Sequence, residues 1–198
     1  MLDKSLLYSD IIMKADKDTA SAWTPSSLPN GYFFKMYEEG DETAWADLET
    51  SVKEFSSREE GLKYFRNVFL PHRQLLPDRM CFVTDRKGRI CATATAWMKE
   101  ENGCYWPILH WVSTSPDVQG MGIGHAVISY ALSLFSGTDP GKDIFLHTQT
   151  WSHPAIRIYY HYGFRITMSS LSGVRTDFRY QETLKGVLPE YILNDIVE

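Results

Sequence analysis

The sequence predicts a mixed α/β fold of the α+β type, in which helices flank a largely antiparallel central sheet. Strand-like runs at 80–84, 90–98 and 104–114 follow one another with short turns between them, which is typical of an antiparallel meander. The last of these runs leads directly into a glycine-rich loop and then into a helical pattern. With 198 residues, of which 43% are hydrophobic, the chain suits a single domain with a sizeable core.

The glycine-rich loop lies in the middle of residues 108–135, ILHWVSTSPDVQGMGIGHAVISYALSLF. The apolar run before it stops at Ser115-Pro116-Asp117, and the apolar spacing after it predicts a helix over 121–135. The first N–H groups of a helix lack intrahelical partners, and glycines let an anion approach the backbone. The stretch therefore predicts a site for a phosphate-bearing ligand.

Ahead of the meander, the pattern predicts two strands and two helices. Asp41 follows a glycine and is expected to be the N-cap of the first helix. Ser57 and Glu60 have the spacing of a capping box for the second helix, which Pro71 ends. The expected bounds are Leu6–Met13 and Tyr32–Tyr37 for the strands, and 41–55 and 58–70 for the helices.

Beyond the glycine loop, Gly163 is expected to stop a helix in the left-handed conformation. A short terminal helix follows Pro189, with Tyr191, Ile192 and Ile196 expected to dock on the core. The remaining expected elements are a strand at 143–150, a helix from Pro154 to Tyr162, and a closing hairpin formed by Phe164–Met168 and Thr176–Thr183.

Composition narrows the class of protein. A formal charge of −5 argues against a nucleic-acid-binding protein, which normally has a basic face. Cys81, Cys91 and Cys104 have no metal-site spacing and are expected to be buried free thiols in a reducing cytosol. No signal peptide and no apolar run of about 18 residues is seen, so we expect a cytoplasmic protein with no membrane segment.

A dinucleotide-binding fold is one interpretation of the glycine run, but the order of its parts does not fit. That fold needs G-x-G-x-x-G after its first strand and an acidic residue at the end of its second. Here three strands precede the loop, the glycines follow G-x-G-x-G, and Asp143 stands at the beginning of the next strand.

Two motifs instead resemble those of the GCN5-related N-acetyltransferase (GNAT) family. Residues 118–124, VQGMGIG, are similar to the Q/R-x-x-G-x-G/A loop that wraps the pyrophosphate of acetyl-CoA in that family. Ala155, Tyr159, Gly163 and Phe164 match its A-x-x-x-Y-x-x-x-G-F segment. The resemblance covers roughly residues 80–170 and implies an acyltransferase that moves groups other than aminoacyl groups, an N-acetyltransferase.

This resemblance also implies where the co-substrate binds. The sheet would splay between the strand ending near Thr114 and the strand at 144–149, and acetyl-CoA would enter there. Within a single domain of 1–198, it implies an N-terminal strand and loop extension at 1–30, acceptor-side helices at 31–78, a cofactor-binding core at 79–170, and a closing strand and C-terminal helix at 171–198. The implied cofactor-binding residues are Val112, Ser113, Thr114, Gln119, Gly120, Met121, Gly122, Ile123, Gly124, Ser152, Ala155 and Tyr159; Ser152 stands where the family often has Asn.

Three residues are candidates for proton transfer. Tyr159 falls on the family's position for the acid that protonates the departing CoA thiolate. His110 resembles the base histidine of the arylalkylamine acetyltransferases, and His147 stands where ribosomal-protein N-terminal acetyltransferases carry a base glutamate. Both histidines remain candidates for the base, and each can also be a strand residue that lines the splay.

The acceptor has no recognisable motif. We expect a primary amine of a small molecule, attacking directly in a ternary complex, because no cysteine matches a family nucleophile position. A protein N-terminus or lysine, or a non-catalytic acyl-CoA-binding module, are the alternatives. No metal, nucleic acid or membrane partner is expected, and a homodimer is left open. The tryptophans fit an aromatic substrate less well than ordinary core packing: Trp45, Trp97, Trp106 and Trp111.

Overall fold

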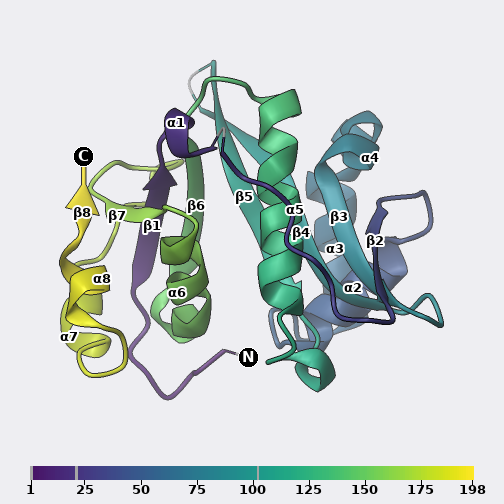
Figure 1. Ribbon diagram of the computed structural model, residues 1–198, viewed down its shortest axis with the longest axis horizontal. Helices are drawn as coiled ribbons and strands as arrows, with labels where there is room; N and C mark the ends of the chain where they lie inside the picture. Colours follow the sequence, from purple (N-terminus) through teal and green to yellow (C-terminus); the bar gives the residue numbers. More distant parts are fainter. Residues whose placement is uncertain (1, 21, 102) are drawn as a thin grey trace. The chain divides into compact units, whose positions relative to one another are not determined.

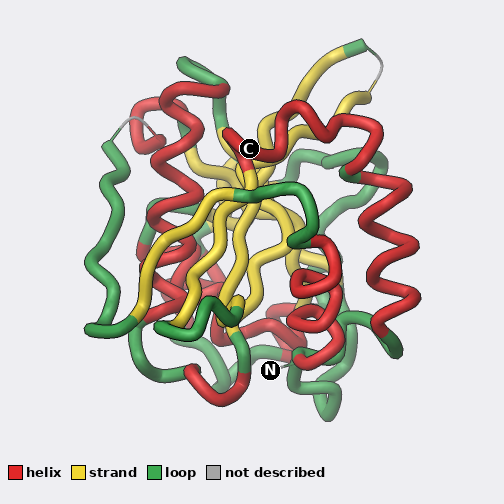
Figure 2. The backbone as a smooth tube through the Cα atoms, turned by 90° about the vertical axis from the view of Figure 1, so that its right-hand side faces the viewer, coloured by secondary structure: helices red, strands yellow, loops and turns green. Residues whose placement is uncertain are grey.

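The computed structural model describes residues 2–20, 22–101 and 103–198. The fold is mixed α/β, with mostly antiparallel strands flanked by helices, as the sequence predicts (Figure 1, Figure 2). No helix of the described part is long and apolar enough to cross a membrane. The chain divides into two compact units: unit 1 comprises Thr24–Trp97 and Leu109–Thr138, and unit 2 comprises Leu2–Trp23, Met98–Ile108 and Asp139–Glu198.

Most of the predicted meander lies in unit 1, whereas Met98–Ile108 belong to unit 2. The strands hydrogen-bond in the order β2-β3-β4-β5, and β3 pairs antiparallel with both β2 and β4. The predicted turn between β3 and β4 is present, with the Gly88 N–H donating to the Asp85 carbonyl at 3.0 Å. The strand bounds are Tyr32–Met36 for β2, Met80–Asp85 for β3, Ile90–Glu101 for β4 and Cys104–Thr114 for β5.

Helices cover both faces of the unit 1 strands. Figure 1 shows α5 in front of the strands, with α2 and α3 behind them. Cys81 and Val83 of β3 are fully buried between these layers, and the Cys81 thiol donates to the Val127 carbonyl of α5. The helical bounds are Glu42–Ser51 for α2, Arg58–Val68 for α3, Leu70–Leu75 for η1, Leu76–Arg79 for α4, Pro116–Val118 for η2 and Ile123–Thr138 for α5.

The two predicted caps in unit 1 differ in outcome. Ser57 caps α3 by accepting from the Glu60 N–H at 3.3 Å, which confirms that half of the capping box. The Asp41 side chain does not cap α2; it accepts instead from the Lys35 ammonium group and from the Glu38 N–H. α2 also ends earlier than predicted, because Lys53 turns the chain with a φ of +69°.

Unit 2 contains the rest of the strands. They hydrogen-bond in the order β5-β6-β1-β7-β8, and β1 is antiparallel to both β6 and β7. The parallel pairing of β5 with β6 is recorded at Ile108 and Phe145. The bounds are Asp10–Ala15 for β1, Lys17–Ala20 for α1, Ile144–Gln149 for β6, Thr150–Ser152 for η3, His153–His161 for α6, Arg165–Thr167 for β7, Tyr180–Thr183 for α7, Glu190–Asn194 for α8 and Ile196–Val197 for β8.

The predicted closing hairpin is wrong in its second strand. Thr176 does not continue a strand, because its hydroxyl accepts from the Ile12 N–H at 3.0 Å and donates to the Thr167 carbonyl at 2.9 Å. The chain then turns into α7, where Tyr180 is fully buried and donates to the Leu193 carbonyl. β8 pairs with β7 in parallel.

Three further expectations in unit 2 are corrected. β1 begins at Asp10, later than the strand expected from Leu6. Cys104 is exposed, because it opens β5, where the first residues of the strand face solvent. Tyr191 is 64% exposed, whereas Ile192 on the other side of α8 is buried as predicted.

Gly163 ends α6 as predicted. Its φ is +88°, its N–H donates to the Tyr160 carbonyl, and the Phe164 N–H donates to the Tyr159 carbonyl, each at 3.0 Å. This pair of bonds is a Schellman motif. A Cβ at Gly163 would overlap the Cγ2 atom of Thr19 in α1.

We expect Gly163→Ala to lower the free energy of unfolding by about 2–3 kcal/mol, because left-handed strain and the collision with Thr19 add together. Urea unfolding measures the loss. Gly141→Ala is the matched control, since its φ is +73° but an added Cβ would meet nothing within 4 Å. Equal losses in the two variants would show that the contact with Thr19 is unimportant.

Candidate active site

The glycine loop of unit 1 forms an open cradle of backbone N–H groups. Gly120 and Gly122 have φ values of +78° and +83°, and a Cβ added at either would meet nothing within 4 Å. The first bond into α5 joins the Ala126 N–H to the Gly122 carbonyl. Within the described part of the chain, the N–H groups of 120–124 have no protein acceptor. A helix start with free N–H groups suits an anion.

Contacts with β4 and β5 hold the base of this loop. The Gln119 side-chain amide donates to the Thr114 carbonyl at 3.0 Å, and the Ser115 N–H donates to the Cys91 carbonyl at 2.8 Å. The Arg89 guanidinium lies 2.7 Å from Asp117 and, with a hydrogen bond from Ser115, lowers the pKa of that carboxyl to about 2. The loop therefore starts from a fixed position on the sheet.

β5 is irregular just before the loop. Trp111 has a φ of +47°, in the left-handed region that a tryptophan rarely adopts. Neighbouring residues of a regular strand face opposite sides, yet His110 and Trp111 both contact Tyr64 of α3. The irregularity at Trp111 thus re-aims one side chain, as β-bulges do.

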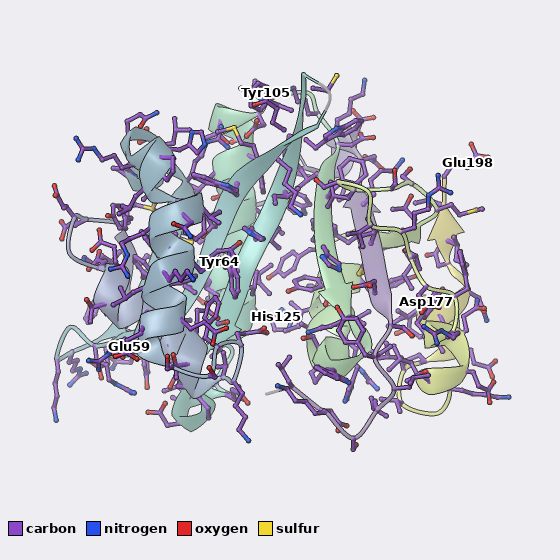
Figure 3. All side chains as sticks on the ribbon, turned by 180° about the vertical axis from the view of Figure 1, so that it is seen from behind. Glu59, Tyr64, Tyr105, His125, Asp177 and Glu198 are labelled. Carbon is purple, nitrogen blue, oxygen red and sulfur yellow. The ribbon has the colours of Figure 1, made fainter. Side chains whose placement is uncertain are left out.

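His110 lies beside Tyr64, with its Nε2 atom 3.3 Å from the tyrosine hydroxyl. Figure 3 shows Tyr64 projecting from α3 toward the strands of unit 1. Burial raises the pKa of Tyr64, and the nearby Glu49 carboxyl raises it further. The rings that surround this pair come from α2, from the segments just before and just after α3, and from β4 and β5: Trp45, Phe55, Phe69, Trp97 and Trp111. Trp45 and Trp97 are buried, which agrees with core packing.

Glu49 is a candidate that the sequence reasoning missed. It is fully buried on α2, and its Oε2 atom accepts from the Ser113 hydroxyl at 2.7 Å. Its Oε1 atom is buried with no hydrogen-bond partner. Burial raises the pKa of Glu49 to about 8, against the opposing hydrogen bond from Ser113. The available signal was its position four residues after Trp45, on the face with Leu48 that α2 buries.

Unit 2 carries the candidate acid. Tyr159 lies on α6, is 7% exposed, and has its ring centroid 6.2 Å from that of Phe164. Ser152 is the residue before α6 and makes no capping bond with its side chain, and Ala155 lies in the first turn. The Schellman motif at Gly163 therefore fixes the same helix that presents Tyr159.

His147 also belongs to unit 2 and has an acidic partner. Its Nε2 atom lies 2.8 Å from the Asp10 carboxylate, which also accepts from the Tyr8 hydroxyl at 2.7 Å. The His147 side chain is 34% exposed. A neighbouring carboxylate orients an imidazole ring by hydrogen bonding to it.

The structure thus sorts the sequence candidates by unit. Unit 1 brings together His110, the Val112–Thr114 segment and the Gln119–Gly124 loop, and it adds Glu49 and Tyr64 to them. Unit 2 contains the others: Tyr159, His147, Ser152 and Ala155. No cluster of three or more metal-binding side chains occurs among the described residues.

Comparisons with known proteins converge on one family. The model of the Acetyltransferase (GNAT) family matches residues 29–164. A GCN5-related N-acetyltransferase from Sphaerobacter thermophilus is 18% identical, with a TM-score of 0.62 over 81% of this chain and 49% of that one. A GNAT-family acetyltransferase from Colwellia psychrerythraea is 14% identical, with a TM-score of 0.59 over 81% of this chain and 54% of that one.

These structures share the fold, and the chain spans about half of their length. A GCN5-related N-acetyltransferase from Kribbella flavida also has a similar fold. It is 15% identical, with a TM-score of 0.53 over 81% of this chain and 55% of that one. No curated protein matches the chain.

Proposed function

The chain belongs to the acetyltransferase (GNAT) family, and we propose from this premise that it transfers the acetyl group of acetyl-CoA to a primary amine of a small molecule. The family generally uses acetyl-CoA as its co-substrate. The observation that carries the assignment to this chain is the open cradle at Gly120 and Gly122, whose free N–H groups suit a pyrophosphate.

On this proposal, acetyl-CoA binds through two parts of unit 1. The N–H groups of 120–124 hold the pyrophosphate, and the backbone of Val112–Thr114 receives the pantetheine arm. One N–H of that segment donates to the thioester carbonyl and stabilises the negative charge that develops on its oxygen. The family motif also assigns Ser152 and Ala155, at the start of α6, to the co-substrate.

The proton transfers are assigned to His110 and Tyr159. His110 accepts a proton from the acceptor amine, directly or through a water, and its partner Tyr64 holds the imidazole ring. Tyr159 donates its phenolic proton to the CoA thiolate as the carbon–sulfur bond breaks. The amine attacks the thioester directly, so no residue of the chain is acetylated during turnover.

The acceptor class is tested by measuring thiol release from acetyl-CoA with a panel of polyamines, amino acids, aminoglycosides and peptides. Turnover with a small amine, above the rate of hydrolysis without acceptor, supports the proposal. Turnover with peptides alone shifts the assignment to a protein N-terminus or lysine. Calorimetric binding of CoA without acetylation of any amine identifies a non-catalytic acyl-CoA-binding module.

We expect His110→Gln to lower kcat/KM by about 10²-fold, because the variant has no base at this position. The acidic limb that a histidine base gives to the pH–rate profile should disappear with it. The matched control is His147→Gln, which removes the histidine that bonds to Asp10. Loss of activity and of the limb in the His147 variant alone would transfer the role of base to His147.

A further inference from the structure

Helix α2 contacts β5 at two points on either side of Val112. The Trp45 ring meets the Trp111 ring edge-on, with centroids 5.4 Å apart. One helical turn later, Glu49 accepts a hydrogen bond of 2.7 Å from Ser113. The residue between the two contacted strand positions is Val112, the first residue of the proposed acyl-CoA-binding segment Val112–Thr114.

The geometry of the two elements allows this double contact. Four residues of a helix rise about 6 Å, and two residues of a strand span about 6.6 Å. Residues 45 and 49 of α2 can therefore meet residues 111 and 113 of β5 at the same time. Both contacts lie inside unit 1.

The hydrogen bond between Glu49 and Ser113 is unusual because it places a carboxyl group on the buried face of α2. A buried carboxyl is unfavourable unless all its atoms are hydrogen-bonded, and the Oε1 atom of Glu49 has no partner. An apolar side chain at position 49 would fill the core without that penalty. However, an apolar side chain could not accept the hydrogen bond from Ser113. Ser113 lies two residues after Trp111, whose φ is +47°.

We propose that Glu49 is a positioning residue that acts through Ser113 to hold the backbone of Val112–Thr114 in the conformation that receives acyl-CoA. The inference rests on the proposed function, since that assigns the segment to the pantetheine arm. A bulky residue such as Trp111 keeps a left-handed backbone conformation only where surrounding contacts hold it there. Trp45 and Glu49 supply two such contacts from a single helix.

The test compares Glu49→Ala and Ser113→Ala with the wild-type protein. Each is expected to raise the Kd for CoA and the KM for acetyl-CoA about tenfold, and the double variant should add little, because the two side chains form one contact. Amide hydrogen exchange at 112–114 in the free protein should become faster in both. Glu49→Gln should restore wild-type values, since its amide oxygen also accepts from Ser113.

Leu48→Ala is the matched control for lost packing. Leu48 lies next to Glu49 on α2 and is 4% exposed. The variant is expected to lower Tm without changing the Kd for CoA or the exchange at 112–114. Equal effects on Kd in the Leu48 and Glu49 alanine variants would overturn the positioning role, as would a failure of Glu49→Gln to restore binding.

The two proposals fail in different ways. If the wild-type protein does not bind CoA, the proposed function fails. Hydrogen exchange in the free protein needs no CoA, so it still decides whether Glu49 holds the segment. Unchanged exchange in both alanine variants, alongside normal CoA binding by the wild-type protein, would overturn the positioning role alone.

Discussion

Replacing Tyr159 by phenylalanine is expected to lower kcat by about 10²- to 10³-fold, the range typical of a lost general acid. Phenylalanine keeps the ring and therefore the contact with Phe164, where the centroids are 6.2 Å apart. The Kd for CoA should change little, because only the hydroxyl is removed. Steady-state kinetics gives kcat, and calorimetry with CoA gives the Kd separately.

Tyr160→Phe is the control for this variant. Tyr160 is the next residue of α6, and its hydroxyl donates to Asp195 at 2.6 Å. We expect it to lose some stability and no turnover, because that hydrogen bond joins α6 to the C-terminal segment. A Tyr159→Phe enzyme with full turnover, or one no slower than Tyr160→Phe, would show that Tyr159 serves only in packing.

The parts of this fold that were predicted correctly are those set by neighbours in sequence. The turn at Asp85–Gly88, the cap at Ser57 and the stop at Gly163 each depend on residues within about six positions, and all three form as predicted. The glycine loop belongs with them: Gly120 and Gly122 take positive φ values just before a helix. Residues close in sequence are enough to predict the backbone conformation in these places.

The parts that were missed depend on partners far along the chain. Thr176 reads as a strand residue, but its hydroxyl bonds Ile12, 164 residues away, and the segment then turns into a helix. Cys104 lies in a strand as predicted yet is exposed, because the position within β5 decides its burial. Strand propensity carries no information about such partners.

The candidate site shows the same division. The motif residues Gln119–Gly124 can be found from spacing, whereas the pairs Tyr64–His110 and Glu49–Ser113 join residues 46 and 64 positions apart. A helical wheel of α2 places Glu49 on the buried face, so its burial could have been predicted. Its bond to Ser113 could not, because the irregularity at Trp111 decides which strand residues face α2.

The burial of Glu49 has a direct consequence for stability. Burial raises its pKa from the ordinary value of 4.5 to about 8 in the folded protein. Between these two pH values the folded state keeps the proton and the unfolded state releases it. The contribution of Glu49 to the free energy of unfolding is therefore fully present below pH 4.5. It falls as pH rises and is lost above about pH 8.

We expect Glu49→Gln to remove this dependence, because glutamine does not titrate and can still accept from Ser113. One group contributes about 1.4 kcal/mol per pH unit, so the difference between variant and wild type should reach a few kcal/mol by pH 8. At pH 5 the two proteins should be nearly equally stable, and at pH 8 the variant should be the more stable.

Urea unfolding at pH 5, 6.5 and 8 measures the difference in the free energy of unfolding. The control is Glu59→Gln, because Glu59 is an exposed residue of α3 (Figure 3). Parallel pH profiles for Glu49→Gln and the wild type would mean that Glu49 is ionised when folded, and that an unrecognised partner compensates the buried charge.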